Sequence, residues 1–293
     1  MTTVKPEEHM SVFRSIFISA FIAFLLLAFF YGLVELLRGV EPAWSWLGMT
    51  LVAGGPLAFF GWVFVTKPAR SLRHPLGNTL LSGLGLAMTM VMSWRFGETA
   101  GIIHIWSGLI FLFWIVYLRW YSVFQNRNST IITPGNNLPE FELQDSNGEI
   151  IQSSSFSGTA HILLFFRGNW CPFCTAQVKE LARQYQAIEA AGAKVAFISP
   201  QPLKKNQALA RRLNIPVEFF CDPQSKAARL LGISDAWGTP TGLQLLGYDS
   251  DTVLPTVLII DQAGVIIYAH QTDNYRLRPE PAEFLRVLTS YKA

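Results

Sequence analysis

Four long stretches in the first 120 residues contain almost no charged side chain, and few folds can accommodate such segments. Each is close to the ~20 residues that cross ~30 Å of hydrocarbon as a helix. A buried soluble core would need helices that are apolar on every face, and a removable signal peptide would be shorter and stand alone. We therefore predict four transmembrane helices. They cover Ile16 to Leu37, Trp46 to Val65, Asn78 to Trp94 and Ala100 to Leu118.

Two ionisable groups, Glu35 and His104, lie near the ends of predicted spans. Such groups can serve a proton relay or a quinone site, but this close to an interface they can also simply reach water. No cysteine occurs in this half of the chain, so it cannot itself pass electrons to a dithiol by disulfide exchange. We expect the region to act as an anchor in the lipid bilayer.

Basic residues between the spans indicate the orientation, because Lys and Arg are retained on the cytoplasmic side. Seven lie in segments that share one side of the membrane, and two lie on the other. The seven are Lys5, Arg14, Lys67, Arg70, Arg73, Arg119 and Arg127, and the two are Arg38 and Arg95. We therefore expect an integral protein of a bacterial inner membrane, with both termini in the cytoplasm.

The composition changes between residues 119 and 136, where polar and turn-forming residues predict a linker. From residue 137 onward there are 14 basic and 15 acidic residues, so nucleic acid is not an expected partner. The predicted organisation is a membrane region at 1–118, a linker at 119–136 and a folded domain at 137–293.

The folded half contains the sequence Arg167-Gly-Asn-Trp-Cys-Pro-Phe-Cys174 between an apolar run, His161 to Phe166, and a helical stretch, Thr175 to Ala191. A cysteine in the first turn of a helix lies near the positive end of the helix dipole, which favours the thiolate and lowers the thiol pKa. A second sulfur one turn later can close a small disulfide. The pattern predicts a redox dithiol, and in a reducing cytoplasm such a pair is catalytic rather than structural.

Half of a zinc site is the main alternative for this pair of cysteines. The remaining candidate ligands, Cys221 and His270, show no recognisable zinc-ligand spacing. No GxGxxG motif opens a helix either, so a bound dinucleotide is not expected. We expect neither a metal nor a cofactor, and an external dithiol reductant would have to reduce an oxidised Cys171–Cys174 pair.

Strand and helix patterns alternate through the folded half and end in a hairpin and an amphipathic helix. The expected strands are Lys194–Ser199, Val217–Phe220, Thr256–Asp261 and Val265–Tyr268, and the expected helices are Lys204–Leu213, Ser225–Leu231 and Glu280–Tyr291. Alternation requires parallel strands joined by helices, whereas the hairpin adds antiparallel strands. The pattern predicts an α/β thioredoxin-like domain, with a mixed sheet between two layers of helices, after an all-α membrane region.

Several motifs in this order resemble the AhpC/TSA peroxiredoxin-like branch of the thioredoxin superfamily. They are Leu138-Pro-Glu-Phe-Glu-Leu-Gln-Asp-Ser-Asn-Gly148, Phe165-Phe-Arg-Gly-Asn-Trp-Cys-Pro-Phe-Cys174, Cys221-Asp-Pro-Gln-Ser225, Leu254-Pro-Thr-Val-Leu-Ile-Ile-Asp-Gln-Ala-Gly264 and Tyr268-Ala-His-Gln-Thr-Asp-Asn-Tyr-Arg-Leu-Arg-Pro-Glu-Pro281. The resemblance covers about residues 137–293 and does not extend to the membrane region.

The resemblance implies roles for individual residues. Cys171 matches the nucleophilic or peroxidatic cysteine, and Cys174 matches the resolving cysteine of a CxxC enzyme. Pro255, before Thr256, matches the cis-proline of thioredoxin folds, where a substrate chain can dock beside the dithiol. A trans proline at the start of a strand is the alternative.

The chain also departs from the family pattern. Gly168 stands three positions before Cys171, where peroxiredoxins have Thr or Ser, and this puts peroxidase activity in question. Arg167 either supplies positive charge near Cys171 or points to solvent. Trp170 is expected to shield the dithiol by local packing, and Pro172 suits the first turn of a helix. Cys221 is either a buried core thiol or a second resolving thiol.

Three functions fit these features. The first is a membrane-anchored thiol peroxidase that reduces hydroperoxides in antioxidant defence. The second is a membrane-tethered thiol-disulfide oxidoreductase that acts on protein disulfides, and the third is a non-catalytic redox-sensing or docking module. Thiolate attack by Cys171 and resolution by Cys174 would serve either of the first two.

Overall fold

The computed structural model of the chain describes residues 6–96, 101–124, 127 and 129–292. Its backbone contacts define two compact units. The helical unit comprises residues 16–67 and 71–123, and the α/β unit comprises residues 124–293 together with residues 1–15 and 68–70. Lys5, Ala100 and positions 125, 126 and 128 of the predicted linker lie outside the described residues.

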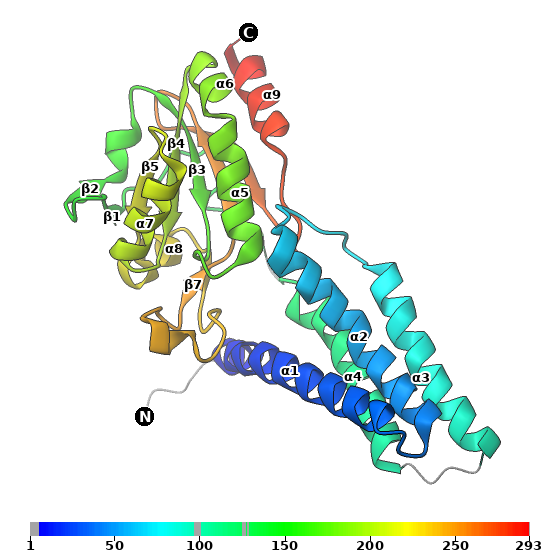
Figure 1. The fold of residues 1–293 in the computed structure, drawn as a ribbon. Helices are drawn as coiled ribbons and strands as arrows, with labels where there is room; N and C mark the ends of the chain where they lie inside the picture. The colour runs from blue at the N-terminus through cyan, green and yellow to red at the C-terminus, as the bar shows by residue number, and fades with distance from the viewer. Residues whose placement is uncertain (1–5, 97–100, 125–126, 128, 293) are drawn as a thin grey trace. The chain divides into compact units, whose positions relative to one another are not determined.

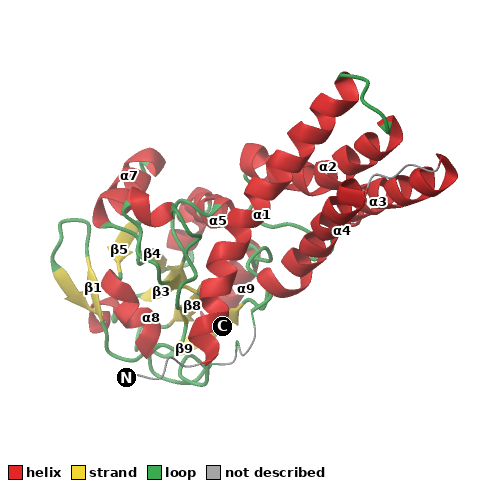
Figure 2. Ribbon diagram, turned by 90° about the horizontal axis from the view of Figure 1, so that it is seen from below, coloured by secondary structure: helices red, strands yellow, loops and turns green. Residues whose placement is uncertain are grey.

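Four helices follow one another in the first part of the chain (Figures 1 and 2). They are α1 (Pro6–Leu37), α2 (Ala43–Thr66), α3 (Leu76–Phe96) and α4 (Gly101–Val116), which continues as the π-helical turn η1 (Tyr117–Tyr121). All four are long and apolar enough to cross a membrane, counting α4 with η1. The prediction of four long apolar helices is therefore confirmed.

Helices α2 and α3 approach each other closely at glycines. A Cβ atom at Gly48 would overlap Thr89 Oγ1, and one at Gly85 would lie 2.6 Å from the backbone nitrogen of Val52. Ser82 Oγ also donates across the contact to the Val52 carbonyl at 2.8 Å. Small residues let helix backbones approach in hydrocarbon, where water cannot drive association. Gly85 therefore explains why the short third stretch forms a packed helix.

The two ionisable groups singled out in the sequence both have polar partners. His104 Nε2 lies 2.5 Å from Ser93 Oγ, which is 3.0 Å from Ser45 Oγ. Glu35 Oε1 lies 3.3 Å from Arg38 Nη1. These contacts account for both groups by local pairing within the helical unit.

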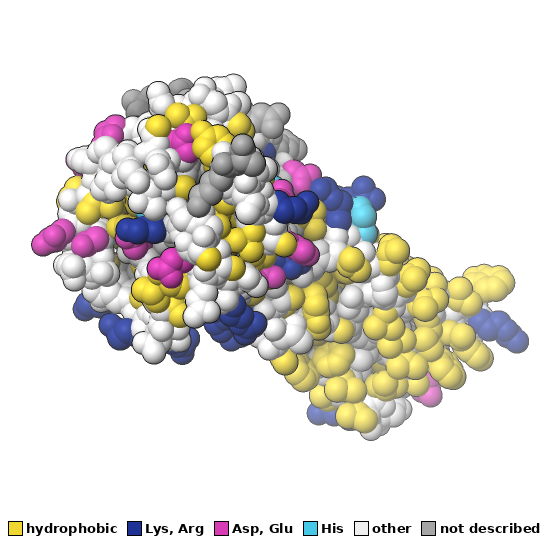
Figure 3. Space-filling model, turned by 90° about the horizontal axis from the view of Figure 1, so that it is seen from above, with side chains coloured by type: hydrophobic (Ala, Val, Ile, Leu, Met, Phe, Trp, Pro, Cys, Tyr) yellow, Lys and Arg dark blue, Asp and Glu magenta, His cyan; other side chains and the backbone are white. Residues whose placement is uncertain are grey.

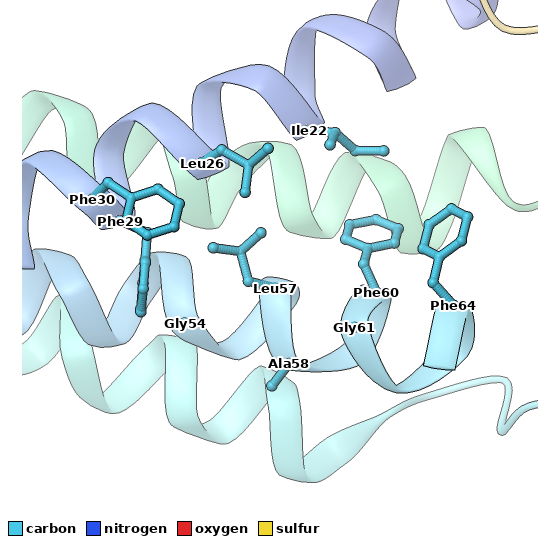
Figure 4. Close-up of a pocket in the computed structure, with 10 residues that line it drawn as sticks. All are labelled: Ile22, Leu26, Phe29, Phe30, Gly54, Leu57, Ala58, Phe60, Gly61 and Phe64. Carbon is cyan, nitrogen blue, oxygen red and sulfur yellow. The ribbon is translucent and has the colours of Figure 1, made fainter. Parts of the chain in front are cut away.

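An apolar groove of about 530 Å³ lies between α1 and α2. Its wall contains four phenylalanines and no charged side chain, as the close-up in Figure 4 shows for Phe29, Phe30, Phe60 and Phe64. Hydrophobic side chains likewise crowd the visible surface of these helices, whereas charged side chains are scattered over the α/β unit (Figure 3). Both features suit a surface that faces hydrocarbon.

The α/β unit is built on a seven-stranded mixed sheet in the order β2-β1-β5-β4-β3-β8-β9. The strands are β1 (Glu142–Gln144), β2 (Ile150–Gln152), β3 (Ala160–Phe165), β4 (Ala193–Ser199), β5 (Glu218–Cys221), β8 (Thr256–Ile260) and β9 (Ile266–Gln271). Strands β3, β4 and β5 are parallel, and β8 is antiparallel to β3 and to β9. A second, small sheet pairs β6 (Ser234–Asp235) with β7 (Thr252–Val253).

Helices cover both faces of the central strands. They are α5 (Pro172–Arg183), α6 (Tyr185–Ala190), α7 (Leu203–Leu213), α8 (Lys226–Leu230) and α9 (Pro281–Lys292), with the short 3-10 helices η2 (Ser153–Phe156), η3 (Pro223–Ser225) and η4 (Leu243–Leu246). Every residue of β8 is buried, and so are the last five residues of both β3 and β4. Because successive side chains point to opposite faces, continuous burial means that both faces are covered.

The thioredoxin-like fold with a mixed sheet is thus confirmed. The predicted helix from Thr175 to Ala191 is two helices, because Gln184 leaves the helical conformation with φ −94° and ψ 7° between α5 and α6. The hairpin of β1 and β2 and the small β6–β7 sheet were not predicted. Both consist of strands of two or three residues, too short to show a period-two pattern.

We predict that Gly48→Ala destabilises the protein by about 1–3 kcal/mol, the usual cost of forcing an extra methyl into a packed contact. The matched control is Gly61→Ala on the same helix, where an added Cβ meets nothing within 4 Å. Thermal unfolding of both variants in detergent micelles provides the measurement. Equal midpoints for the two variants would show that the α2–α3 contact is not close.

Candidate active site

The two cysteines of the CxxC motif lie where β3 ends and α5 begins. Cys171 is the residue before the helix, Pro172 is its first residue, and Cys174 lies in the first turn. Pro172 thus occupies the position where a missing backbone N–H costs nothing. Both thiols are free and buried, with exposed fractions of 2% for Cys171 and 0% for Cys174. A thiolate in such a buried place needs neighbouring groups that stabilise its charge.

The two sulfurs share a hydrogen bond, which separates their ionisation. The pKa of Cys171 is well above its ordinary value, because Cys171 donates the hydrogen bond to Cys174, is buried, and lies beside the negative charge of Cys174. Burial opposes ionisation of Cys174, but the hydrogen bond from Cys171 and the Arg278 and Arg167 guanidinium groups lower its pKa to about 6. The pKa is thus raised at Cys171 and lowered at Cys174, which is the reverse of the lowered pKa expected at the first cysteine.

Two buried arginines lie near the dithiol, one just before it in the sequence and one in the C-terminal segment. Arg278 Nη2 lies 3.9 Å from Cys174 Sγ, and its side chain is 6% exposed. Arg167 is 5% exposed and donates to the Gly238 carbonyl and to Asp235 Oδ2. Arg167 thus points into the protein, and its charge favours the thiolate form of both cysteines. The sequence left open whether Arg167 lies near Cys171 or points to solvent, and the structure buries it.

Arg127, from the predicted linker, holds the start of β8. Its Nη2 donates to the Pro255 carbonyl and to Thr256 Oγ1, both at 3.0 Å, and its Nε donates to the Thr272 carbonyl. Thr256 pairs with Phe165, the last residue of β3. The Arg127 contact therefore lies at the end of the strands from which the loop carrying Cys171 departs. Burial lowers the pKa of Arg127 to about 10, against the attraction of Asp235.

The peptide bond before Pro255 is trans, since Glu41–Pro42 is the one cis bond in the described part of the chain. The match of Pro255 to the cis-proline of thioredoxin folds is therefore wrong for this structure. In the trans arrangement the Pro255 carbonyl accepts the hydrogen bond from Arg127, and Thr256 enters the ladder directly. Pro255 and Thr256 thus lie beside the site and are joined to it by their hydrogen bonds from Arg127.

Asp235 places a buried carboxyl among these cations. Its Oδ2 lies 3.4 Å from Arg167 Nη2. Burial raises the pKa of Asp235, and the charges of Arg167 and Arg127 oppose that rise. Although Asp235 offsets part of the charge of Arg167, both Arg167 and Arg278 favour a thiolate on the dithiol.

Gly168 has a conformation that explains why no larger residue stands there. Its φ is +149°, and a Cβ atom would lie 2.8 Å from the Trp170 indole nitrogen. Asn169, the next residue, donates its backbone N–H to Gln201 Oε1 at 2.8 Å. A Thr or Ser at this position would strain the backbone and push the indole away. The loop before Cys171 therefore has a backbone conformation at Gly168 that requires glycine.

Trp170 packs within this loop, as expected. The Arg167 guanidinium carbon lies 4.9 Å from its ring centroid, and the Tyr275 ring lies 5.8 Å from the same carbon on another side. Tyr275 also contacts Phe173 edge to face at 5.8 Å. These rings leave little room for water beside Arg167, which strengthens the effect of its charge.

Sequence reasoning missed several residues of the site. Arg278, Tyr275, Asp235, Gln201 and Arg127 received no role. Four of the missed or neighbouring residues, Asn274, Tyr275, Arg276 and Arg278, belong to the last motif quoted for the family resemblance. The structure buries all four, and buried charged residues need polar partners. Arg127 was counted as a topological charge and gave no sign of its contact with Thr256.

Cys221 lies at the end of β5 and is 4% exposed. Its thiol donates to the Gln201 carbonyl at 3.1 Å, and burial raises its pKa to about 12. These features describe a buried core thiol.

Residues 134–269 match the model of the AhpC/TSA family. The chain is 27% identical over 150 residues to Peroxiredoxin Q, chloroplastic, of Triticum aestivum, covering 51% of this chain and 62% of that protein. It is 28% identical over 164 residues to the protein of the same name from Sedum lineare, covering 55% of this chain and 80% of that protein.

Two solved structures cover a similar share of the chain. Peroxidoxin BcpB from Mycobacterium tuberculosis superposes with a TM-score of 0.46 and 19% identity, over 55% of this chain and 99% of that one. AhpC of Enterococcus faecalis superposes with a TM-score of 0.46 and 16% identity, over 54% and 92%. Residues 134–269 therefore form a peroxiredoxin-like domain of the thioredoxin superfamily that matches the AhpC/TSA family model, and the chain joins this domain to four long apolar helices.

Proposed function

We propose that this protein is a membrane-anchored thiol peroxidase in which Cys171 and Cys174 form the redox dithiol. The observation that carries the proposal is the buried dithiol at the start of α5, with the Arg278 guanidinium 3.9 Å from Cys174. A thiolate is the reactive form of cysteine, and buried cations are the means of maintaining it. The peroxiredoxin relatives support a hydroperoxide as oxidant.

The first step is attack on the hydroperoxide by Cys171, the sulfur nearer the end of the loop. Its proton passes along the hydrogen bond to Cys174, which acts as the base. A bond forms between the Cys171 sulfur and the distal oxygen, the O–O bond breaks, and the alcohol leaves after taking a proton. The sulfur is oxidised to sulfenic acid, and the hydroperoxide is reduced by two electrons.

The second step is resolution. Cys174, restored to thiolate by the charge of Arg278, attacks the sulfenic sulfur and releases water, which closes the Cys171–Cys174 disulfide. An external dithiol of the thioredoxin type or a small thiol then reduces the disulfide by exchange. Across the cycle one donor dithiol and one hydroperoxide are converted to the donor disulfide, one alcohol and one water.

Disulfide exchange with proteins is the second candidate, and Gly168 favours it. Peroxiredoxins have a hydroxyl side chain at this position, and the φ of +149° at Gly168 shows that the loop is built without one. The same dithiol chemistry would then begin with attack on a substrate disulfide and form a mixed disulfide.

We also propose that residues 1–118 are a membrane region, 119–136 a connecting segment and 137–293 the redox domain. The lengths and composition of the four helices support insertion in a bilayer. The distribution of Lys and Arg supports a bacterial inner membrane with both termini in the cytoplasm.

We predict that Cys171→Ser in the full chain lowers hydroperoxide consumption by on the order of 100-fold or more, because it removes the nucleophile. Cys174→Ser should leave a single oxidation per molecule, with a sulfenic acid that a dimedone-type reagent traps. Cys221→Ser is the matched control and should retain turnover. The assay follows peroxide loss with a dithiol donor, in parallel with reduction of a peptide disulfide.

If Cys171→Ser lowers disulfide reduction but the wild-type protein consumes no hydroperoxide, the second candidate is correct. If Cys171→Ser changes neither rate, both catalytic candidates fail.

We predict a pH dependence set by Arg278. Thiolate absorbance at 240 nm should appear with a midpoint near pH 6, the value to which the pKa of Cys174 is lowered. Arg278→Met removes a cation that favours the thiolate, so the midpoint should rise by about 1 to 3 pH units. Arg278→Lys should restore part of the shift. An unchanged midpoint in a folded Arg278→Met protein would refute this role.

We predict that a fluorescent protein fused after Ala293 fluoresces in bacterial cells, whereas alkaline phosphatase fused there is inactive. Both outcomes follow from a cytoplasmic carboxyl terminus. The reverse pattern would place the dithiol outside the cytoplasm and favour the protein-disulfide candidate.

A further inference from the structure

The loop between β6 and β7 carries an exposed hydrophobic tip, which we define as Trp237, Leu245 and Leu246. The exposed fractions are 44% for Trp237, 92% for Leu245 and 62% for Leu246. Gly242 and Gly247 flank the short helix η4 with φ of +103° and +83°, which turns the chain sharply on both sides of the leucines. The loop therefore projects two leucines away from the α/β unit.

The backbone of this loop is held next to β6 and β7. Thr239 N–H donates to the Ser250 carbonyl at 3.0 Å, and the backbone N–H of Trp237, whose side chain is partly exposed, donates to Asp251 Oδ1 at 3.0 Å. A held base with a bare apolar end is the arrangement of a surface that contacts something apolar.

The same loop is joined to the loop of the dithiol. Tyr248 Oη donates to Asn169 Oδ1, two residues before Cys171. Thr252 Oγ1 donates to the Arg167 carbonyl at 3.0 Å. Whatever the tip contacts is therefore held close to the redox site.

The chain indicates what that apolar contact is. Thr241 N–H donates to the Ser15 carbonyl at 3.2 Å, and Ser15 Oγ donates to the Thr239 carbonyl at 2.6 Å, with all three residues in the α/β unit. Ser15 is followed directly by the apolar run from Ile16 to Leu37, so the tip is tethered at the residue where the first predicted span starts.

The number of helices also bears on the side of the bilayer on which the α/β unit lies. An even number of spans returns the chain to the side on which it started, whichever orientation the protein has. The amino-terminal end of α1 and the α/β unit therefore share one side of the bilayer, if all four helices cross it. Trp and Leu are residues that favour the boundary between headgroups and acyl chains.

We propose that the hydrophobic tip of Trp237, Leu245 and Leu246 inserts into the headgroup–acyl boundary of the bilayer that the chain's own helices span. Insertion holds the dithiol loop at the membrane surface, where it meets oxidised groups carried by lipid. The docking itself is independent of the catalytic reaction, whereas the preference for lipid-borne hydroperoxide rests on the proposed peroxidase function.

Docking is tested with the full chain in phosphatidylcholine nanodiscs. A bimane label at Leu245→Cys, in a background with Cys171, Cys174 and Cys221 replaced by Ser, is exposed to doxyl-labelled phosphatidylcholine and to aqueous iodide. The matched control is the same label at Ile150→Cys, on the edge strand β2 and 59% exposed. Doxyl quenching at position 245 with little iodide quenching, and the reverse at position 150, is the expected result. Iodide quenching at both positions overturns the proposal.

The consequence for substrate is tested with the three cysteines intact. The double variant Leu245→Ser, Leu246→Ser should lose about tenfold or more in rate on phosphatidylcholine hydroperoxide, because it removes two apolar side chains that would be buried in the bilayer. Its rate on hydrogen peroxide should stay at the wild-type value. Equal losses on both substrates, or a loss seen as weaker binding of the dithiol donor, would show that the tip serves the fold or a protein partner and would refute the proposal.

The two experiments separate the two hypotheses. If the wild-type protein consumes neither peroxide, the peroxidase function fails while doxyl quenching at position 245 still establishes docking. If peroxide is consumed but the label at position 245 is quenched by iodide alone, the peroxidase function stands and docking fails.

Discussion

Stabilising a negative charge on a buried pair of thiols is the constraint on which this site depends. Cys171 and Cys174 are almost completely removed from solvent, and a thiolate in such a place is unstable without cations. Arg278 approaches Cys174 from the C-terminal segment, and Arg167 lies four residues before Cys171. The fold brings these groups together, because the end of β3 lies beside the start of β8, which in turn pairs with the end of β9, the strand that leads to Arg278.

The buried cations need anchors of their own. Asp235 and the Gly238 carbonyl hold Arg167, while Arg127 bridges the Pro255 carbonyl and Thr256. Each contact joins segments that are far apart in sequence. A change at any of them therefore acts on the dithiol through the position of a guanidinium group, without touching sulfur.

The helical unit is held together by a different kind of contact. Its helices pack through Gly48 and Gly85, and its polar groups are paired locally, as His104 is with Ser93. Such contacts stabilise a bundle in a medium where the hydrophobic effect offers no help. The α/β unit instead buries continuous apolar strands such as β8, as a water-soluble domain does.

The sequence by itself determined the long elements and the fold class. Uncharged runs predicted the four helices, because charge is excluded from hydrocarbon, and short continuous apolar runs predicted β3, β4, β8 and β9. The position of Cys171 and Cys174 at a strand-to-helix junction was equally readable, since both signals are local.

Tertiary structure decided everything that depends on distant residues meeting. The sequence predicts a lowered pKa at the first cysteine, but the pKa is lowered at Cys174, which accepts a hydrogen bond from Cys171 and lies beside Arg278, a residue more than a hundred positions away. The trans bond at Pro255 and the burial of Arg127 likewise follow from contacts between remote segments. Periodicity and spacing report on neighbours along the chain, whereas charge stabilisation depends on distance in space, and only the folded sheet sets that distance.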